Sequence, residues 1–253
     1  MDQLANGAKI YFAIKTPWFT INITQTVVTI LVATILMIVL ALVIKKHLKK
    51  RPCGFQVIVE KLVDMLYGLV EGTMGKHNLK FAPYIGTLFL SSIICTLLGM
   101  TQILRSATAD ISVTLAWALV TTGMVWYSSI KNFGFKAWLK GFTEPIVVMT
   151  PMNIVSEIAQ PVSLAFRHFG NVAGGGVLTA LIYTSLAGLT NLLFGWISGL
   201  IQYIPFLQVG IPAFLSIYFD LFSGFVQAFV FCLLTMVYVG SANPPKESAE
   251  DGE

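Results

Sequence analysis

Hydrophobic runs without a single charged residue recur along this chain and indicate its architecture. Three runs contain no Asp, Glu, Lys or Arg, namely residues 16–44, 81–104 and 111–130. Each has at least the roughly 20 residues that a helix needs to cross the hydrocarbon core of a bilayer. The charged residues between 141 and 245 are only Glu144, Glu157, Arg167 and Asp220. The pattern predicts an all-α polytopic membrane protein with five transmembrane helices.

Element boundaries follow from the same pattern, within a single membrane domain that covers residues 1–253. The expected order is an external N-terminus at 1–20, transmembrane helices at 21–44, 81–104 and 111–130, a long helix at 142–194, a last helix at 205–240 and a cytoplasmic tail at 241–253. The last two helices are longer than a bilayer is thick, so we expect them to be tilted. The residues expected to break the helix between them are Gly195, Gly199, Pro205, Gly210 and Pro212.

Residues 54–74 show a different pattern, in which apolar residues fall on one helical face and charged residues lie between them. Glu60, Lys61 and Asp64 make this segment a poor spanning helix. The sequence therefore predicts one amphipathic helix that lies along the membrane surface, in addition to the five spans.

Composition narrows the class of protein further. The chain is 56% hydrophobic and only 11% charged, whereas soluble globular domains carry about 25% charged residues. A soluble domain, a disordered chain and a secreted disulfide scaffold are thereby excluded. The net charge of +4 does not indicate nucleic acid, because the basic residues cluster at the ends of the apolar runs. The three cysteines form no CxxC or Cys/His pattern, so we expect no metal site and no cofactor.

Basic residues also orient the chain in the membrane. The cluster Lys45–Arg51 follows the first run, and the positive-inside rule places it in the cytoplasm. With that orientation, twelve Lys and Arg residues are cytoplasmic and three are external, which are Lys9, Lys15 and Arg105. The N-terminus is expected outside and the C-terminus in the cytoplasm. The first run is too long for a cleavable signal, which favours the plasma membrane of a bacterium.

Arg167 is the most unusual residue of the sequence. A guanidinium keeps its charge in a protein, and an ionisable group at membrane depth costs at least about 2.5–3.5 kcal/mol. Its presence therefore requires either a partner or a function. One interpretation is a structural arginine that pairs with Glu157 or Asp220, or that extends to the membrane interface.

Two polar stripes give Arg167 a context. Spacings of three and four residues place one stripe on the long helix, and it consists of Glu157, Gln160, Leu164, Arg167, Asn171 and Gly174. The same rule gives a second stripe on the last helix, which consists of Asp220, Ser223, Gly224 and Gln227. Water-filled half-pathways explain two such stripes more easily than contact with lipid does. A purely structural seam of hydrogen bonds is the alternative.

A family resemblance rests on these same residues. The segment from Glu157 to Asn171, EIAQPVSLAFRHFGN, resembles the arginine-helix signature of the a subunit of F-type ATP synthases. The segment from Gln227 to Tyr238 resembles the last helix of that family, and weaker similarities lie at 108–116 and 17–22. Together they follow the family through essentially the whole chain, in order.

The resemblance implies a stator subunit that works against a rotating ring of c subunits and contacts the b-subunit peripheral stalk. Protons or sodium ions would enter one half-channel, neutralise a ring carboxylate, travel with the ring and leave by the other half-channel. The ATP chemistry would belong to other subunits, so this chain would bind no nucleotide and have no catalytic site of its own.

The resemblance also implies roles for individual residues. Arg167 matches the essential arginine that holds the passing carboxylate ionised and blocks leakage between the half-channels. Gln227 matches the glutamine that faces this arginine, and Asn171 matches a polar neighbour one turn away. Asp220 stands where members of the family carry a histidine or an acid that relays ions. Glu157 matches an acid near the cytoplasmic end of the exit path.

Two departures from the family pattern and two other functions complete the hypotheses. His168 replaces the commoner leucine, either to tune the channel or simply to form a hydrogen bond. Gly176 stands where some members carry Glu or His, so that the relay there is either missing or provided by Asp220. A self-contained ion channel or carrier with Arg167 as its gate would conduct without a ring. A membrane scaffold would lose only stability on loss of Arg167. The choice between protons and sodium ions is not encoded in these residues.

Overall fold

The computed structural model describes residues 10–15, 20–50, 54–101, 104–144, 146–194 and 217–245. Within these residues, five helices are long and apolar enough to cross a membrane, namely Gln25–His47, Lys76–Met100, Ile111–Phe133, Val147–Thr190 and Ser223–Ser241. The predicted all-α polytopic membrane fold is thereby confirmed. The expected break between 195 and 212, the first residues of the expected last helix and the tail beyond 245 lie outside the described residues.

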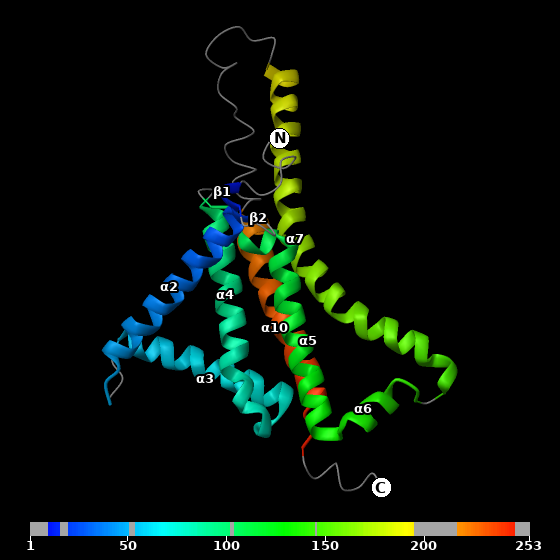
Figure 1. Ribbon diagram of the computed structural model, residues 1–253. Coiled ribbons are helices and arrows are strands. Elements are labelled where there is room, and N and C mark those ends of the chain that lie inside the picture. The colour runs from blue at the N-terminus through cyan, green and yellow to red at the C-terminus, as the bar shows by residue number, and fades with distance from the viewer. Residues whose placement is uncertain are drawn as a thin grey trace.

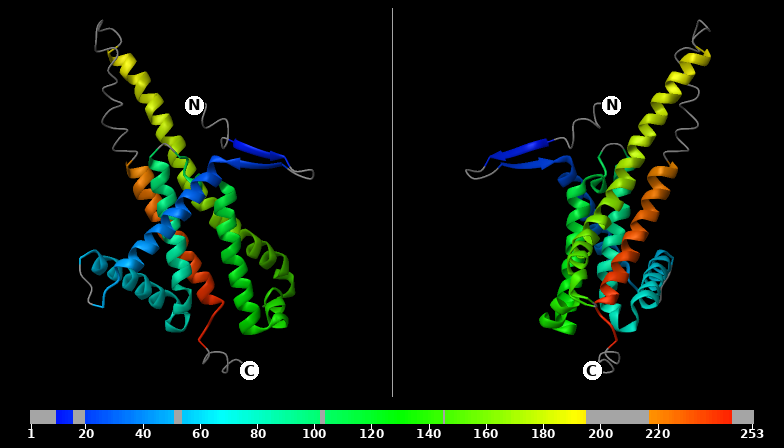
Figure 2. Two further views of the ribbon diagram at one scale, coloured as in Figure 1. Left: turned by 60° about the vertical axis from the view of Figure 1, so that its left-hand side comes forward. Right: turned by 90° about the vertical axis from the view of Figure 1, so that its right-hand side faces the viewer.

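A β-hairpin precedes the first helix, in a region where the sequence predicted only an external N-terminus. Strand β1 (Ile10–Lys15) pairs antiparallel with β2 (Thr20–Thr24). Threonine and isoleucine dominate β2, and β-branched residues favour strands. The hairpin projects sideways from the helices, as Figure 2 shows.

Helices α2 and α3 form the edge of the molecule. α2 (Gln25–His47) begins directly after the hairpin and has only three buried residues, which are Thr26, Thr29 and Ala33. The amphipathic α3 (Phe55–Met74) runs from the far end of α2 toward the base of α4 (Figure 1). It ends at Gly75, whose φ of 80° suits glycine and whose N–H donates to the Glu71 carbonyl.

Three helices form the centre of the bundle with their axes roughly aligned, and α4 runs antiparallel to the other two (Figure 1). They are α4 (Ala82–Met100), α5 (Ile111–Phe133) and α10 (Ser223–Ser241), with the short 3₁₀ helices η1 (Lys76–Phe81) before α4 and η2 (Ala107–Ala109) before α5. Asp110 caps α5 by accepting a hydrogen bond from the Ser112 N–H at 3.0 Å. The same carboxylate accepts from Thr26 Oγ1 at 3.0 Å and so links α5 to α2.

The hydrophobic core lies where these helices meet α3 and α7. Its buried members are Val70, Met74, Ala82, Ile85, Leu88, Ala118, Leu164, Ala165, Phe231, Cys232, Met236 and Val239. Because α7 contributes only Leu164 and Ala165 to this list, one narrow face of that helix holds it to the bundle.

Helix α7 (Thr150–Phe194) follows the short α6 (Phe135–Gly141) and the 3₁₀ helix η3 (Val147–Met149). Its 45 residues correspond to about 68 Å, more than twice the thickness of a hydrocarbon core. The helix bends and extends well beyond the ends of α4 and α5 (Figures 1 and 2). It contains Pro161 and the run Gly174–Gly176, both of which are known causes of bending.

Both ends of α10 are distinctive. A π-helix, η5 (Ile217–Phe222), leads into it. At the other end, three asparagines form what we term the asparagine cluster: Asn78, Asn132 and Asn243. Asn132 Nδ2 donates to the Ala242 carbonyl at 2.9 Å, and Asn78 Nδ2 donates to the Asn243 carbonyl at 2.9 Å. These bonds fasten the end of α10 to η1 and α5.

Candidate ion-translocation site

Helix α7 has two contrasting faces at its centre. Leu164, Ala165 and His168 are 3%, 0% and 1% exposed and pack against the bundle. Arg167 is exposed, although it is the immediate neighbour of His168. It also lies near the midpoint of the candidate span Val147–Thr190. The chain therefore presents a permanent positive charge on its outer surface, in the middle of a membrane-spanning helix.

Arg167 makes no ion pair with any residue whose side chain the structure describes. Glu157, one of its two suggested partners, precedes it by ten residues, which separates the two by about 15 Å along the helix axis. The Glu157 carboxylate instead accepts a hydrogen bond from Trp126 Nε1 on α5. A structural pair between Arg167 and Glu157 is therefore excluded.

Asn171 and Gln227 join the two helices that carry the polar stripes. Asn171 Nδ2 on α7 donates to Gln227 Oε1 on α10 at 2.6 Å, one turn along α7 from Arg167. Gln227 is only 3% exposed, and its Nε2 has no hydrogen-bond partner among the described residues. The resemblance implies that Gln227 faces Arg167 and that Asn171 is a polar neighbour one turn away, and the structure adds a direct hydrogen bond between Asn171 and Gln227.

The outer face of α7 around Arg167 is bare. Gly170 and Gly174, which follow Arg167 by three and seven residues on the same helical face, have nothing within 4 Å of the position that a Cβ atom would occupy. Gly224 on α10 behaves in the opposite way, because a Cβ there would lie 2.5 Å from Thr96 Cγ2 on α4. The glycine of α10 allows a close approach inside the chain, whereas those of α7 leave space outside it.

His168 belongs to the interior and contacts three other helices. Its Nε2 lies 3.2 Å from Ser92 Oγ on α4, and its ring meets Trp117 of α5 and Phe231 of α10 edge-on. Its Nδ1 is buried without a hydrogen-bond partner in the described part of the chain. The histidine therefore lies behind Arg167 and helps to fix how α7 is turned.

Glu157 and Gln160 line a polar cavity of about 500 Å³ between α5, α6, α7 and α10. Ser156, Asn153, Tyr238 and Ser241 also contribute to its wall. The cavity lies near the last turn of α10, at the end of the bundle where α6 folds back. It is large and polar enough to hold water beside the Glu157 carboxylate.

The first polar stripe is divided by the structure. Leu164, which the spacing places on it, is part of the core, while Glu157 faces the cavity and Arg167 faces outward. Asp220 lies in the π-helix η5, which packs against α7, but its side chain is outside the described residues. π-Helical turns are frequent at functional sites.

Several contacts at this site have no signal in the sequence. Trp126, Ser92 and Trp117 come from α4 and α5, and nothing in their spacing connects them with the arginine helix. The part of the chain that the structure describes holds no group of three or more His, Cys, Asp or Glu residues that could bind a metal ion.

Comparisons with known proteins agree on one family. A family model described as ATP synthase A chain matches residues 26–240. The sodium-ion-specific ATP synthase subunit a of Propionigenium modestum is 34% identical over 221 residues, which are 81% of this chain and 69% of that protein. ATP synthase subunit a of Anoxybacillus flavithermus is 31% identical over 233 residues, or 88% of this chain and 93% of that protein. The subunit a of Listeria welshimeri is 31% identical over 225 residues, or 85% and 90%.

Proposed function

This chain belongs to the ATP synthase A chain family, and on that premise we propose how its residues carry ions through the stator of the synthase. As subunit a it is part of the ATP synthase complex and takes part in ion transport. Its partners in our proposal are a ring of c subunits, which passes the outer face of α7, and the b-subunit peripheral stalk. The hydrolysis and synthesis of ATP fall to other subunits, and this chain carries no catalytic site.

The exposed charge of Arg167 is the observation that carries the proposal. A lone guanidinium near the midpoint of a span needs a counter-charge, and the described residues of this chain do not provide one. A carboxylate on a passing ring subunit would provide it. At about 4 Å and an effective dielectric constant near 20, such a pair is worth roughly 4 kcal/mol. This attraction holds the carboxylate ionised, so that the arriving subunit releases its ion before it passes Arg167.

The glycines beside Arg167 support a protein partner at this face. Small residues let two helix backbones approach closely in a membrane, and Gly170 and Gly174 face open space in this chain. A ring helix can therefore come near enough to α7 for its carboxylate to reach the guanidinium. Asn171 and Gln227 hold α10 beside α7, so that both helices present one continuous surface to the ring.

The polar cavity at Glu157 is the proposed half-channel on the cytoplasmic side. The carboxylate of Glu157 and the amide of Gln160 line a space that water can fill. Asp220 is the proposed relay of the other half-channel, since it lies on the helix that faces α7. Arg167 separates the two paths and prevents direct leakage. His168 acts from behind as a positioning residue for Arg167.

In this proposal the surroundings of the ring carboxylate largely determine which ion is transported. One relative is named as sodium ion specific, so sodium coupling is a specific candidate beside proton coupling. ATP hydrolysis that does not respond to added sodium over a wide pH range would argue against sodium. We further propose that the protein resides in a bacterial plasma membrane, with its N-terminus outside and its C-terminus in the cytoplasm.

ATP-driven ion uptake into inverted membrane vesicles that carry Arg167→Ala tests the proposal. Co-purification of the other subunits reports assembly, and Arg105→Ala is a matched arginine control outside the predicted spans. We expect no uptake from an assembled Arg167→Ala complex and normal uptake from the control. Normal uptake by Arg167→Ala would leave a structural arginine instead. Ion conduction by the chain alone in liposomes would point to the self-contained channel.

A further inference from the structure

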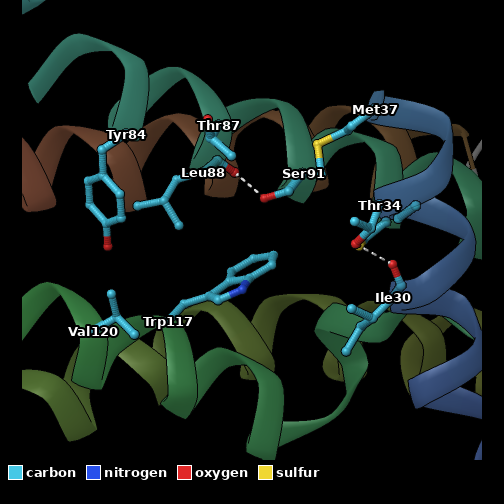
Figure 3. Close-up of a pocket in the computed structure, with 11 residues that line it drawn as sticks. Ile30, Thr34, Met37, Tyr84, Thr87, Leu88, Ser91, Trp117 and Val120 are labelled. Atoms are coloured by element: carbon cyan, nitrogen blue, oxygen red, sulfur yellow. Dashed lines mark hydrogen bonds between the residues drawn. The ribbon is translucent and has the colours of Figure 1, made fainter. Parts of the chain in front are cut away.

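An apolar cavity of about 280 Å³ lies between α2, α4 and α5, apart from the proposed ion path. Figure 3 shows Trp117 of α5 extending into it from one side and Ser91 of α4 and Thr34 of α2 from others. Ala33 and Met37 of α2 also line the cavity. The cavity is just below the roughly 300 Å³ at which small-molecule pockets begin, so it suits the end of a flexible chain.

The hydroxyl groups of this cavity are already engaged and leave an apolar lining. The Tyr84 hydroxyl forms a hydrogen bond with Thr121 Oγ1 at 3.0 Å. The other three hydroxyls each donate to a backbone carbonyl of their own helix, and Figure 3 shows two of these bonds as dashed lines. The three bonds run from Thr34 Oγ1 to Ile30 at 2.8 Å, from Thr87 Oγ1 to Pro83 at 2.7 Å and from Ser91 Oγ to Leu88 at 3.0 Å. A hydrocarbon chain therefore fits the lining better than water or an ion does.

The cavity lies where α2 separates from α4. The buried residues of α2 all belong to its first half, the last being Ala33. Beyond it, Leu40, Ala41 and Ile44 continue the face of Met37 at spacings of three and four residues, and none of them is buried. Figure 1 shows the two helices diverging toward α3. The second half of α2 thus forms an apolar path that leads to Met37 and the cavity.

A cluster of positive charge stands at the other end of this path. Lys45, Lys46, Lys49 and Lys50 are exposed, and none of them forms an ion pair within the described residues. Gln56 fixes the cluster by bonding both the N–H and the carbonyl of Lys49 at 2.9 Å. Eight residues separate Met37 from Lys45, which is about 12 Å along the helix.

We propose that this region binds one anionic phospholipid. Its phosphate contacts the lysine cluster, and an acyl chain follows the second half of α2 and ends in the cavity at Trp117. Clusters of basic residues next to a transmembrane helix attract anionic headgroups, and here the charge and the cavity lie on the same helix. Trp117 also contacts His168, so the bound chain packs against a direct neighbour of the residue behind Arg167.

Photocrosslinking in the whole ATP synthase tests this assignment. The complex is reconstituted in vesicles that contain phosphatidylglycerol or phosphatidylcholine with a diazirine near the end of the acyl chain. Mass spectrometry then maps the labelled positions after illumination. Met37 and Trp117 report the cavity, and Ile35 and Val39, which point away from it on the same helix, report bulk lipid. We expect several-fold more labelling by phosphatidylglycerol than by phosphatidylcholine at the cavity, and equal labelling at the control positions.

Two changes distinguish recognition of the lipid headgroup from binding of its acyl chain. Replacing the four lysines of the cluster with Gln should abolish the preference at the cavity, while Lys131→Gln with Lys136→Gln should preserve it. Thr34→Phe, which fills the mouth, should remove labelling of Trp117 and spare Val39. Equal labelling by both lipids at the cavity would overturn the proposal. Absence of labelling there in the assembled complex would also overturn it and indicate that another subunit covers the cavity.

Discussion

The inner and outer faces of α7 differ sharply at the centre of the helix. On the inner face, Leu164, Ala165 and His168 are almost fully buried. On the outer face, one residue away, Arg167 is exposed beside glycines that touch nothing. The inner face is covered by other helices of the chain, whereas no described residue of the chain covers the outer face at Gly170 and Gly174. Substitutions on the two faces should therefore fail in different ways.

Among variants that keep Arg167, the largest effect on transport is expected from a bulky side chain on the outer face. Gly174→Leu meets no atom of this chain within 4 Å of its Cβ and improves helix propensity, so the chain should remain folded. The helices of the proposed c-subunit ring could then no longer approach α7 closely. A displacement of about 1 Å at a reacting site costs roughly a hundredfold in rate. ATP-driven uptake into vesicles should fall by that order. Gly72→Leu, on the exposed face of α3, is the matched control, and an equal loss there would contradict the explanation.

A matched substitution on an inner surface should lower the stability of the folded chain. Gly224→Ala places a methyl group 2.5 Å from Thr96 Cγ2, and overpacking of this kind costs about 1–3 kcal/mol. Thr96 cannot turn away freely, because its Oγ1 donates to the Ser92 carbonyl at 3.0 Å. The amount of the chain in membranes and the thermal stability of the complex should both decrease. Thr96→Ser removes the clashing methyl and should restore them, and persistent instability in the double variant would refute this cause.

Removing the charge of Glu157 should have an intermediate effect on ion uptake. Glu157→Gln keeps the size of the side chain and its hydrogen bond from Trp126, but removes the charge from the polar cavity. Uptake should fall several-fold while assembly stays normal, since no other titratable acid except Glu144 lines this cavity. Glu144→Gln is the matched control, because its carboxylate pairs with Lys140 at the exposed rim. Unchanged uptake in the Glu157 variant would place the cytoplasmic path elsewhere.

The smallest effect should come from His168. His168→Leu replaces the ring with an apolar side chain and leaves Ser92 without its partner at 3.2 Å. Such hydrogen bonds in membranes average about 0.6 kcal/mol, so stability should change little. Ion uptake should stay within about twofold of normal and keep the same dependence on pH, since the imidazole ring of His168 serves to position α7. An altered pH profile would instead make His168 part of the ion path.

The sequence predicted the class of fold and the place of the key arginine, because a bilayer demands long apolar helices and makes a charge within them conspicuous. It did not predict that Leu164 enters the core while Arg167 remains exposed. Spacing along one helix defines a stripe, but the direction in which the stripe faces depends on α5 and α10. The contacts of Glu157 with Trp126, and of His168 with Ser92, likewise arise from packing between helices that lie far apart in the sequence.

The asparagine cluster has a mechanical consequence. In the proposed function, a ring that moves past α7 and α10 exerts a force on those helices, and movement of the helices in response would weaken the coupling. Asn78 and Asn132 grip the backbone at Ala242 and Asn243 from two different elements. Asn243 Nδ2 also bonds back to the Val239 carbonyl at 2.9 Å, which stiffens the final turn. The end of α10 is thus held in place by hydrogen bonds to η1 and α5, so that a sideways force on this helix is transmitted to the rest of the bundle.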